Sequence, residues 1–571
     1  MVRNGCVIRS PVSEAERAAL KAQAGAAFRA GDLAAAQITL ERYVCLFSED
    51  GAGYANLLAV ARRRNVALSG LVDLTRYALF ADPDNSGPLV ALLTACAELQ
   101  VPVPDRAAGL LARYGTDPDV TLAHAICLHG QRGAQAAVAR VRQTLVSHPA
   151  EARLYIQGGT SLQSENDTGA ETAFARALCC AQPHGGEFAE AARNLAALRH
   201  AAGALGDAVS LYRASLRADS TAIDARANLA AALVDCGEPA AAEETLRRTL
   251  VERPQHRDAL WLSSLLRIGA GDVTGGYRAH HVRWTEPHAE ARTLALAALP
   301  LWLGQDPNGA RIFVWGDFGV GDEIVFAPLA AWLAERGAAV VLEMDPRLVS
   351  LAQRSFPDVT VVPRGGPPVE LGDFDFHAPS ALLARFYERD GGRKALLPLR
   401  ADPKRVSMFR KNLAEFGPGP KIGFSWGGGG KRTSWSKSTE LTDWTGLLDT
   451  PDVTFVSLQY DVAKNGEGAG DWPRNLHPAP LEDLRNDLDG LAALIEALDA
   501  TVSISGVNAH MAGALRRPGF VLLPRSPLWF WGRNSPRTCW YPTLQLFRRA
   551  ESEWSDPIAG LSKAVRQFLT G

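Results

Sequence analysis

The sequence predicts two architectures in one chain: an all-α solenoid of helix pairs, followed by two α/β lobes. Three observations divide the 571 residues in this way. Glycines recur every 34 residues near the middle of the chain. After about residue 300, short β-branched and aromatic runs alternate with helix-like segments, as in parallel α/β folds. All 13 tryptophans lie at or after Trp261, whereas the preceding 260 residues are rich in Ala, Leu and Arg.

The repeat unit is clearest around Gly203, Gly237 and Gly271, each of which separates two helix-like segments. Larger residues stand nine and thirteen positions after each glycine: Tyr212, Leu216, Leu246, Leu250, His280 and Trp284. The same offsets after Gly31 give Leu40 and Val44. Proline ends earlier units at Pro83, Pro118, Pro149 and Pro183, because it cannot continue a helix.

This 34-residue helix–turn–helix pattern resembles the tetratricopeptide repeat. It extends over roughly residues 15–285, in seven or eight units, of which those before residue 190 are degenerate. Such repeats stack into a solenoid with a concave groove, which usually binds a peptide or a protein segment. A spacer or a dimerisation scaffold is the alternative role. Residues 286–309 are expected to be a linker.

The second half predicts two Rossmann-like lobes, at residues 310–400 and 401–571. Strands are expected at 311–315, 339–343, 359–362 and 374–377 in the first lobe, and at 421–426, 453–457, 501–505 and 519–523 in the second. Helices are expected at 324–336, 346–355, 488–498, 508–515 and 557–569, with a connection at 390–420. Ligands bind at the carboxyl ends of parallel strands, so the loops after 311–315, 421–426 and 501–505 should line a cleft.

The first of these loops reads Gly-Asp-Phe-Gly-Val-Gly-Asp-Glu over residues 316–323. Gly319 and Gly321 would let a ligand approach the backbone. A dinucleotide fingerprint is excluded, because the glycine spacing is wrong and two carboxylates would repel phosphate. We expect Asp322 to act as a general base facing the cleft. The alternative is that Asp322 caps the helix that follows.

The second loop begins at Trp426 and contains the glycine run 427–430, followed by Lys431 and Arg432. Backbone amides and cations that follow a strand can hold phosphate oxygens. We therefore expect Gly427, Gly428, Lys431 and Arg432 to bind phosphate. A flexible solvent loop is the alternative.

The third loop carries Ser505 and Gly506 into a helix that contains Asn508 and His510. A helix N-terminus favours an anion, and Asn508 or His510 could contact a phosphate or a ribose. The alternative is a structural histidine.

No metal site is expected. The Asp373-Phe374-Asp375 segment has the form of a metal-binding DxD motif. It lies on an expected strand, so we interpret the two aspartates as polar residues at the end of that strand and not as metal ligands. His280 and His281 lack partners at ligand spacing and are interpreted as repeat surface.

Composition excludes several classes of protein. Hydrophobic residues make up 47% and charged residues 21%, which excludes disorder over most of the length. The net charge of −2 argues against a dedicated nucleic-acid binder. No secretory signal or 18-residue apolar run is present, and the eight cysteines form no CxxC pair. These features predict a reduced, cytoplasmic protein without a membrane span.

The second half resembles the GT-B glycosyltransferase domain that follows tetratricopeptide repeats in many bacterial proteins, and which is related to the heptosyltransferases of lipopolysaccharide synthesis. The matching segments begin at residues 316, 421, 453, 502 and 526, and include GDFGVGDEIVFAPL, KIGFSWGGGGKR and VSISGVNAHMAGAL. In that family the acid of the first glycine loop is the base, which matches Asp322. Ser505-Gly506 departs from the family's Asp-Thr, whereas Asn508-Ala509-His510 is similar to a segment of O-GlcNAc transferases.

The order of repeats and lobes resembles the soluble flagellin glycosyltransferases of alphaproteobacteria. This resemblance implies transfer of a nonulosonic acid of the pseudaminic acid type from its CMP-activated form to Ser or Thr of flagellin. The repeats would recruit flagellin, the second lobe would bind the nucleotide-sugar, and the enzyme would be inverting and metal-independent, with no cofactor.

The expected site consists of Asp322 as the catalytic base and a set of donor-binding residues. That set is Gly319, Gly321, Trp426, Gly427, Gly428, Lys431, Arg432, Ser505, Gly506, Asn508 and His510. Two other functions remain open. One is hexosyl or heptosyl transfer to a polysaccharide or lipid, and the other is a non-catalytic repeat scaffold with a degenerate GT-B domain.

Overall fold

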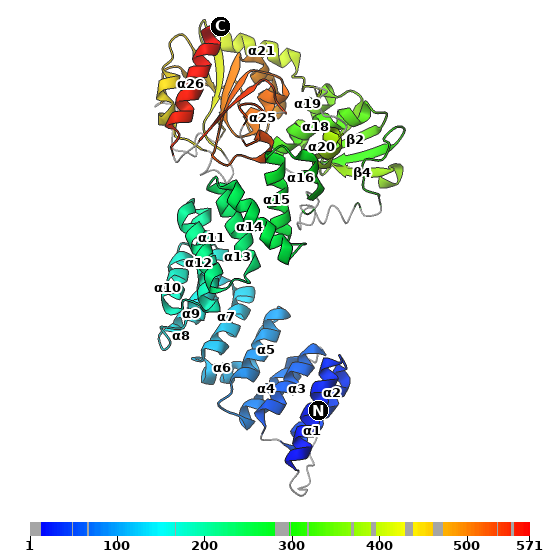
Figure 1. Cartoon of the computed structure of the whole chain (residues 1–571), viewed down its shortest axis with the longest axis vertical. Coiled ribbons are helices and arrows are strands. Elements are labelled where there is room, and N and C mark those ends of the chain that lie inside the picture. The colour runs from blue at the N-terminus through cyan, green and yellow to red at the C-terminus, as the bar shows by residue number, and fades with distance from the viewer. Residues whose placement is uncertain are drawn as a thin grey trace. The chain divides into compact units, whose positions relative to one another are not determined.

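The structure is a computed structural model. It describes residues 13–47, 50–64, 68–165, 167–279, 282, 296, 299–316, 319–366, 370–389, 396–428, 438–460, 472–533, 535–538, 540–549 and 553–570. The chain forms two compact units (Figure 1). One unit comprises residues 1–202 with 207–225, and the other comprises residues 203–206 with 226–571. The second unit therefore holds the last repeat helices together with both α/β lobes.

The described part of the first unit is built from helices joined by short turns. The α-helices are α1 (Glu14–Arg29), α2 (Leu33–Leu46), α3 (Gly51–Arg63), α4 (Leu68–Ala81), α5 (Gly87–Glu98), α6 (Ala108–Tyr114), α7 (Pro118–Arg132), α8 (Ala134–Leu145), α9 (Ala152–Ser164), α10 (Gly169–Cys180), α11 (Gly186–Ala201) and α12 (Leu205–Ala218). Neighbouring helices pack in pairs, such as α7 on α8 and α9 on α10. Small residues allow this approach, since a Cβ at Gly159 would lie 2.7 Å from the Phe174 ring.

The repeat glycines adopt the turn conformation that the spacing predicts. Gly31, Gly203, Gly237 and Gly271 have φ angles of 78°, 81°, 73° and 97°, a region that favours glycine. They separate α1 from α2, α11 from α12, α13 (Ile223–Asp235) from α14 (Pro239–Glu252), and α15 (Arg257–Gly269) from α16 (Val273–Ala279). The residues nine positions after the first three glycines, Leu40, Tyr212 and Leu246, are buried. The predicted helix-pair repeat is confirmed, although His280, His281 and Trp284 lie outside the described residues.

The first lobe has a four-stranded parallel sheet in the order β3-β2-β1-β4. Its elements are β1 (Arg311–Trp315), α18 (Val320–Ala334), β2 (Ala339–Met344), α19 (Val349–Ser355), β3 (Val359–Pro363), β4 (Phe376–Pro379) and α20 (Ser380–Arg389). In register, Val314 of β1 stands opposite Leu342 of β2 and Ala378 of β4.

The second lobe has a six-stranded parallel sheet in the order β10-β9-β8-β5-β6-β7. Its elements are α21 (Pro403–Ala414), β5 (Lys421–Ser425), α23 (Thr445–Leu448), β6 (Thr454–Ser457), β7 (Leu476–Pro478), α24 (Leu488–Ala497), β8 (Ala500–Ile504), α25 (Val507–Ala514), β9 (Gly519–Leu523), β10 (Leu544–Arg548) and α26 (Ser555–Thr570). Phe424 of β5 stands opposite Ser457 and Val502. The predicted solenoid followed by two Rossmann-like lobes, the arrangement of the GT-B fold, is confirmed.

Aromatic side chains join the last repeat helices to the first lobe inside the second unit. Tyr277 of α16 packs edge-on against Phe326 of α18 and against Trp529, and the Phe326 and Trp529 rings stack at 5.7 Å. These residues belong to a hydrophobic core that includes both faces of the first sheet and continues into α24 and α25. A separate core lies on the second sheet beneath α26.

The two aspartates of the DxD-like segment have a structural role at the start of β1. The Asp375 carboxylate accepts a hydrogen bond from the Arg311 amide (2.8 Å), and Asp373 lies 3.6 Å from the Arg311 guanidinium. Among the residues that the structure describes, no three His, Cys, Asp or Glu side chains form a group able to hold a metal ion. Within the same ranges, no helix is long and apolar enough to cross a membrane, and the described cysteines form no disulfide bond.

Candidate functional site

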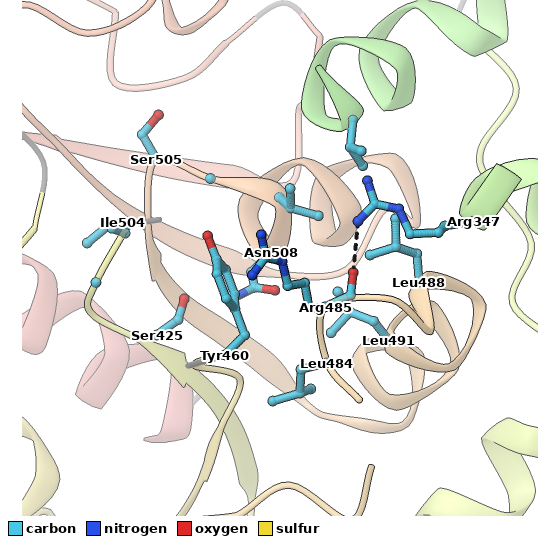
Figure 2. A pocket seen from close by; sticks show the side chains of 15 residues that line it. Arg347, Ser425, Tyr460, Leu484, Arg485, Leu488, Leu491, Ile504, Ser505 and Asn508 are labelled. Atoms are coloured by element: carbon cyan, nitrogen blue, oxygen red, sulfur yellow. Dashed lines mark hydrogen bonds between the residues drawn. The ribbon is translucent and has the colours of Figure 1, made fainter. Parts of the chain in front are cut away.

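A pocket of about 260 Å³ opens at the carboxyl ends of β5 and β8, within the second unit. Figure 2 shows how its walls come from both lobes. The first lobe contributes Val320, in the first turn of α18, and Arg347, which follows β2. The second lobe contributes residues of five segments: Ser425, Gly427, Gly428, Tyr460, Leu484, Arg485, Leu488, Leu491 and the run 504–508. The loops expected to line a cleft therefore do meet at one pocket.

Arg347 is held in a fixed orientation at the wall of this pocket. Its Nε and Nη2 donate to the two carboxylate oxygens of Asp345, each at 2.8 Å, and its Nη1 donates to the Arg485 carbonyl (3.1 Å). The bonds from Arg347 hold the pKa of Asp345 below its usual value, so this carboxylate stays ionised. A guanidinium has five N–H donors, and three are used here. Two donors thus remain for a ligand.

The charge of the pocket favours an anion. Arg347 and Arg485 contribute guanidinium groups, and none of the described lining residues is an Asp or Glu. The Arg485 guanidinium lies over the Tyr460 ring, 5.9 Å from its centroid. The N-terminus of α25 also reaches the pocket, since Gly506, Val507 and Asn508 line it. Positive guanidinium groups and a helix N-terminus together suit phosphate or carboxylate oxygens.

The polar residues at the start of α25 are held by neighbours from other segments. The Ser505 hydroxyl accepts a hydrogen bond from Trp531 Nε1 (2.9 Å), and Asn508 Nδ2 donates to the Leu458 carbonyl (3.1 Å). These bonds fix the segment that turns from β8 into α25. The pocket therefore has a rigid floor, with Ser505, Gly506 and Asn508 where the sequence predicts donor contacts.

The glycine loop after β5 lines the pocket with its backbone, but its amides already have partners. The amides of Trp426 and Gly427 donate to Gln459 Oε1 at 3.2 and 2.9 Å, and the Gly428 amide donates to Ser438 Oγ (3.0 Å). The Trp426 side chain is 3% exposed and packs in the core on Phe424, outside the pocket lining. Lys431 and Arg432 lie outside the described residues.

His510 also lies beside the pocket rather than in its lining. The imidazole is buried, stacks on Trp531 at 4.9 Å, and shares a hydrogen bond between Nδ1 and the Tyr541 hydroxyl (3.2 Å). Its ring rests against the start of α18, where a Cβ at Gly321 would lie 3.0 Å from His510 Cδ2. Glycine at 321 is thus needed for this close approach of α18 and α25.

Asp322 belongs to the same cluster. It lies in the first turn of α18, between Gly321 and the buried Glu323, which is held by Arg364 and by the Asp345 amide (2.6 Å). Burial raises the pKa of the Tyr541 hydroxyl well above its usual value, and the negative charge of Asp322 raises it further. Asp322 is half-buried next to the pocket, two residues after Val320, which lines it. Gly319 precedes α18 as its N-cap and does not line the pocket.

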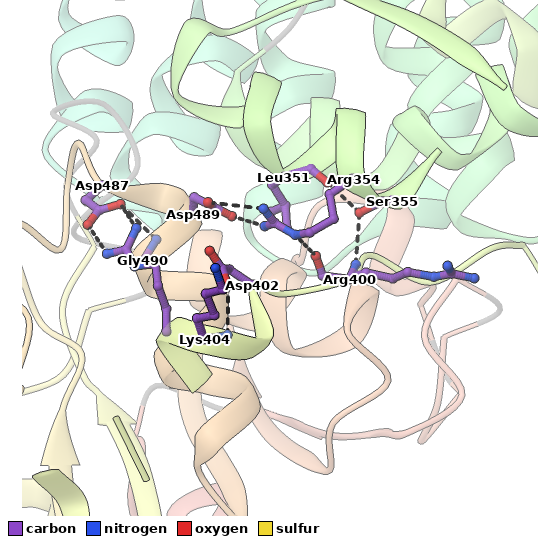
Figure 3. A network of polar contacts seen from close by, with 10 residues as sticks. Leu351, Arg354, Ser355, Arg400, Asp402, Lys404, Asp487, Asp489 and Gly490 are labelled. Atoms are coloured by element: carbon purple, nitrogen blue, oxygen red, sulfur yellow. Dashed lines mark hydrogen bonds and ion pairs between the residues drawn. The ribbon is translucent and has the colours of Figure 1, made fainter. Parts of the chain in front are cut away.

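A polar network joins α19, α24 and the connection between the two lobes (Figure 3). Arg354 of α19 forms an ion pair with Asp489 of α24 and donates from Nε to the Arg400 carbonyl (2.8 Å). The Arg400 amide donates to Ser355 Oγ (2.9 Å), which ties the connection between the lobes to α19. The network thus joins α19, which follows Arg347, to α24, which supplies Leu488 and Leu491 to the pocket.

Sequence reasoning missed Arg347, Tyr460 and Arg485. Arg347 follows the carboxyl end of β2, and Tyr460 follows that of β6. Because ligands bind at the carboxyl ends of parallel strands, the same criterion that identified the other three loops could have identified these two residues. Arg485 lies between β7 and α24, where no local signal marks it.

A family model and a curated protein are similar to parts of the chain. Residues 199–266 match the family model for the tetratricopeptide repeat. Protein FlbA of Caulobacter vibrioides (strain ATCC 19089 / CIP 103742 / CB 15) is 28% identical over 403 residues, which are 64% of this chain. The match spans 65% of the length of that relative, slightly less than two thirds.

Two solved structures are similar to parts of the chain. A glycosyl transferase family 9 protein from Veillonella parvula DSM 2008 is 11% identical, and the likeness covers 47% of this chain and 99% of that one, with a TM-score of 0.35. A tetratricopeptide repeat protein from Parabacteroides merdae ATCC 43184 is 14% identical, and the likeness covers 50% of this chain and 99% of that one, with a TM-score of 0.31. The family model supports tetratricopeptide repeats at residues 199–266, and the chain's own structure shows the two parallel α/β lobes with a pocket between them.

Proposed function

We propose that this chain is a glycosyltransferase, and that the pocket between its lobes binds a nucleotide-activated sugar. One observation carries the proposal. Guanidinium groups from both lobes and the N-terminus of α25 meet in a pocket that has no carboxylate among its described lining residues. This arrangement suits the phosphate of a nucleotide, and the Tyr460 ring offers an apolar face for the base or sugar.

The donor and the acceptor follow from the resemblance to flagellin glycosyltransferases. The proposed donor is a CMP-activated nonulosonic acid of the pseudaminic acid type, and the proposed acceptor is Ser or Thr of flagellin in the cytoplasm. Such a donor carries one phosphate and one sugar carboxylate, and the pocket presents two guanidinium groups, Arg347 and Arg485. The repeats would recruit flagellin, as repeat solenoids recruit other protein segments.

The transfer would proceed as a single displacement with inversion. The acceptor hydroxyl oxygen forms a bond to the anomeric carbon, and Asp322 takes the proton of that hydroxyl. The bond between the anomeric carbon and the phosphate oxygen breaks, and its electron pair leaves with CMP. Arg347, Arg485 and the N-terminus of α25 stabilise the phosphate charge, so this scheme uses no metal and no cofactor.

The Asp322→Asn substitution tests this scheme. A positioned base contributes about 10²–10⁴-fold, so we expect the rate of transfer to fall by about 100-fold or more while CMP affinity stays unchanged. Asp373→Asn is the matched control, because that carboxylate is exposed at Arg311, outside the pocket.

Equal rates for Asp322→Asn and the wild type would remove Asp322 as the base. If the wild-type chain bound CMP and flagellin but transferred no sugar, the scaffold function would be supported instead. Transfer to a polysaccharide or lipid that persists without the repeats would support the third function.

A further inference from the structure

A second pocket, of about 450 Å³, lies where the last repeat helices meet the α/β lobes inside the second unit. One wall is the turn between α15 and α16, from Ile268 to Gly271. The other wall comes from the segment that follows β9, and includes Trp529 and Trp540. The walls of this pocket therefore come from both the repeat helices and the second lobe.

Helix α18 connects this second pocket to the first. Phe326 of α18 stacks on Trp529 at 5.7 Å and packs edge-on against Trp540 at 5.8 Å. Val320, at the start of the same helix, lines the first pocket. At a rise of about 1.5 Å per residue, Val320 and Phe326 are about 9 Å apart along the helix. Asp322 lies on the segment between them, one turn before Phe326 and on the same face.

The chemistry of the second pocket differs from that of the first. Trp529, Phe530 and Trp540 make it largely apolar. Arg533 is neutralised by Glu243 (3.0 Å) and donates to the Leu266 carbonyl (2.6 Å). Arg537 is exposed and donates to the Pro542 carbonyl (2.7 Å), and it has no carboxylate partner in the part of the chain that the structure describes. One cation at the rim is thus available for a ligand.

We propose that this second pocket is the acceptor subsite. It takes an extended polypeptide segment that carries the reactive Ser or Thr, with an apolar residue against Trp529 and Trp540 and an acidic residue near Arg537. A polypeptide is favoured because one wall belongs to the repeat helices, and because the rim cation is complementary to a carboxylate side chain. This inference rests on the proposed function, since it places the acceptor on the other side of Asp322 from the donor.

Gly269→Leu tests the subsite by filling it. A Cβ at Gly269 would lie 3.6 Å from Arg533 Cγ and 3.9 Å from Trp529 Cα, which are ordinary van der Waals distances. The Cβ of the leucine therefore fits, and the rest of its side chain would occupy part of the pocket that these residues line. Gly130→Leu is the control for placing leucine in a helix, because Gly130 is also helical, in α7 of the first unit, with no atom within 4 Å of the added Cβ. Unlike Gly269, which is buried, Gly130 is exposed.

We expect Gly269→Leu to raise KM for flagellin by about tenfold or more, with unchanged CMP affinity and unchanged donor hydrolysis in the absence of flagellin. Gly130→Leu should behave as the wild type. Wild-type KM in Gly269→Leu would overturn the subsite. Failure of the wild-type chain to transfer any sugar would instead overturn the proposed function.

A photo-crosslinking amino acid at the exposed position Ala270 gives a readout that does not depend on turnover or on a filled pocket. Crosslinking to flagellin is expected at position 270 and not at position 130, and a peptide with Asp beside its Ser should compete better than one with Lys. The preference for Asp should disappear in Arg537→Gln. No crosslink at position 270, or a crosslink to carbohydrate alone, would contradict the proposal.

Discussion

Replacing Arg347 with Met tests whether this residue binds the donor phosphate in the first pocket. Arg347 uses three of its five N–H donors on Asp345 and on the Arg485 carbonyl, which leaves two for the donor phosphate. Methionine keeps much of the side-chain volume and removes these donors together with the charge. The lobes remain joined, because the ion pair between Arg354 and Asp489 is untouched.

The magnitude follows from the number of lost donors. A hydrogen bond to a charged group contributes about 1.5–3 kcal/mol, and the contribution of a pair is not fully additive. The substitution also leaves the Asp345 carboxylate without its guanidinium partner, and this negative charge repels a phosphate. We therefore expect a loss of about 2–3 kcal/mol, equivalent to a Kd for CMP that is roughly 30- to 150-fold higher.

Isothermal titration calorimetry with CMP and with cytidine measures this directly. The Kd for CMP should rise in Arg347→Met, whereas binding of cytidine, which lacks the phosphate, should change little. Arg347→Lys should give an intermediate Kd, because lysine keeps the charge but cannot form the same pair of directed bonds. An unchanged Kd for CMP, or an equal loss for cytidine, would refute the assignment of Arg347 to the phosphate.

Two further predictions concern stability. Gly513→Ala should lower the midpoint of thermal unfolding by an amount equivalent to about 1–3 kcal/mol, because the added Cβ would lie 2.6 Å from Tyr541 Cδ1. Gly130→Ala, in an exposed helix, should be neutral or stabilising. If calorimetry gave the same shift of the midpoint for both variants, close packing at Gly513 would be contradicted. Burial, helped by the charge of Arg140, lowers the pKa of His124 to about 4 in the folded repeats. In the unfolded chain this histidine has its ordinary pKa of about 6.5, so between pH 6.5 and 4 the unfolded state binds a proton that the folded state does not. The first unit should therefore lose stability as the pH falls from about 6.5 to 4, and His124→Gln, followed by thermal unfolding at both pH values, should remove that dependence.

Local sequence patterns were sufficient for the central elements of the fold. The repeat glycines require a left-handed turn at Gly203, Gly237 and Gly271. The inner strands β5 and β8 are buried along their whole length and are rich enough in apolar residues for their positions to be predicted. The sequence reasoning missed β7 and β10, which are the two edge strands of the six-stranded sheet. Edge strands are partly exposed, and β7 has only three residues, so their patterns are weak.

The expected connection at 390–420 contains a helix, α21, that the sequence reasoning did not identify. Its apolar residues Val406, Phe409 and Leu413 have helical spacing and are buried, but Lys and Arg dominate the rest of the segment. The mean composition therefore concealed the apolar stripe that packs α21 on α24.

Some residues of the site could be predicted from their own segment of sequence, whereas the positions of others depend on distant parts of the chain. Gly427, Gly428, Ser505, Gly506 and Asn508 line the first pocket because they follow strand ends, which sequence patterns can locate. The burial of His510 depends on Trp531 and Tyr541, which come from a later part of the chain, and so its position could not be predicted from its own segment. The same holds for the second pocket, whose walls are more than 250 residues apart in sequence.

The most direct measurement of the central claim is the intact mass of flagellin after incubation with the wild-type chain and a CMP-activated nonulosonic acid. Flagellin should gain whole nonulosonic acid residues on Ser or Thr, CMP should be released in equal amount, and Asp322→Asn should form almost none of this product. An unchanged flagellin mass, while the chain still binds both CMP and flagellin, would contradict the claim that the pocket between the lobes transfers sugar to protein.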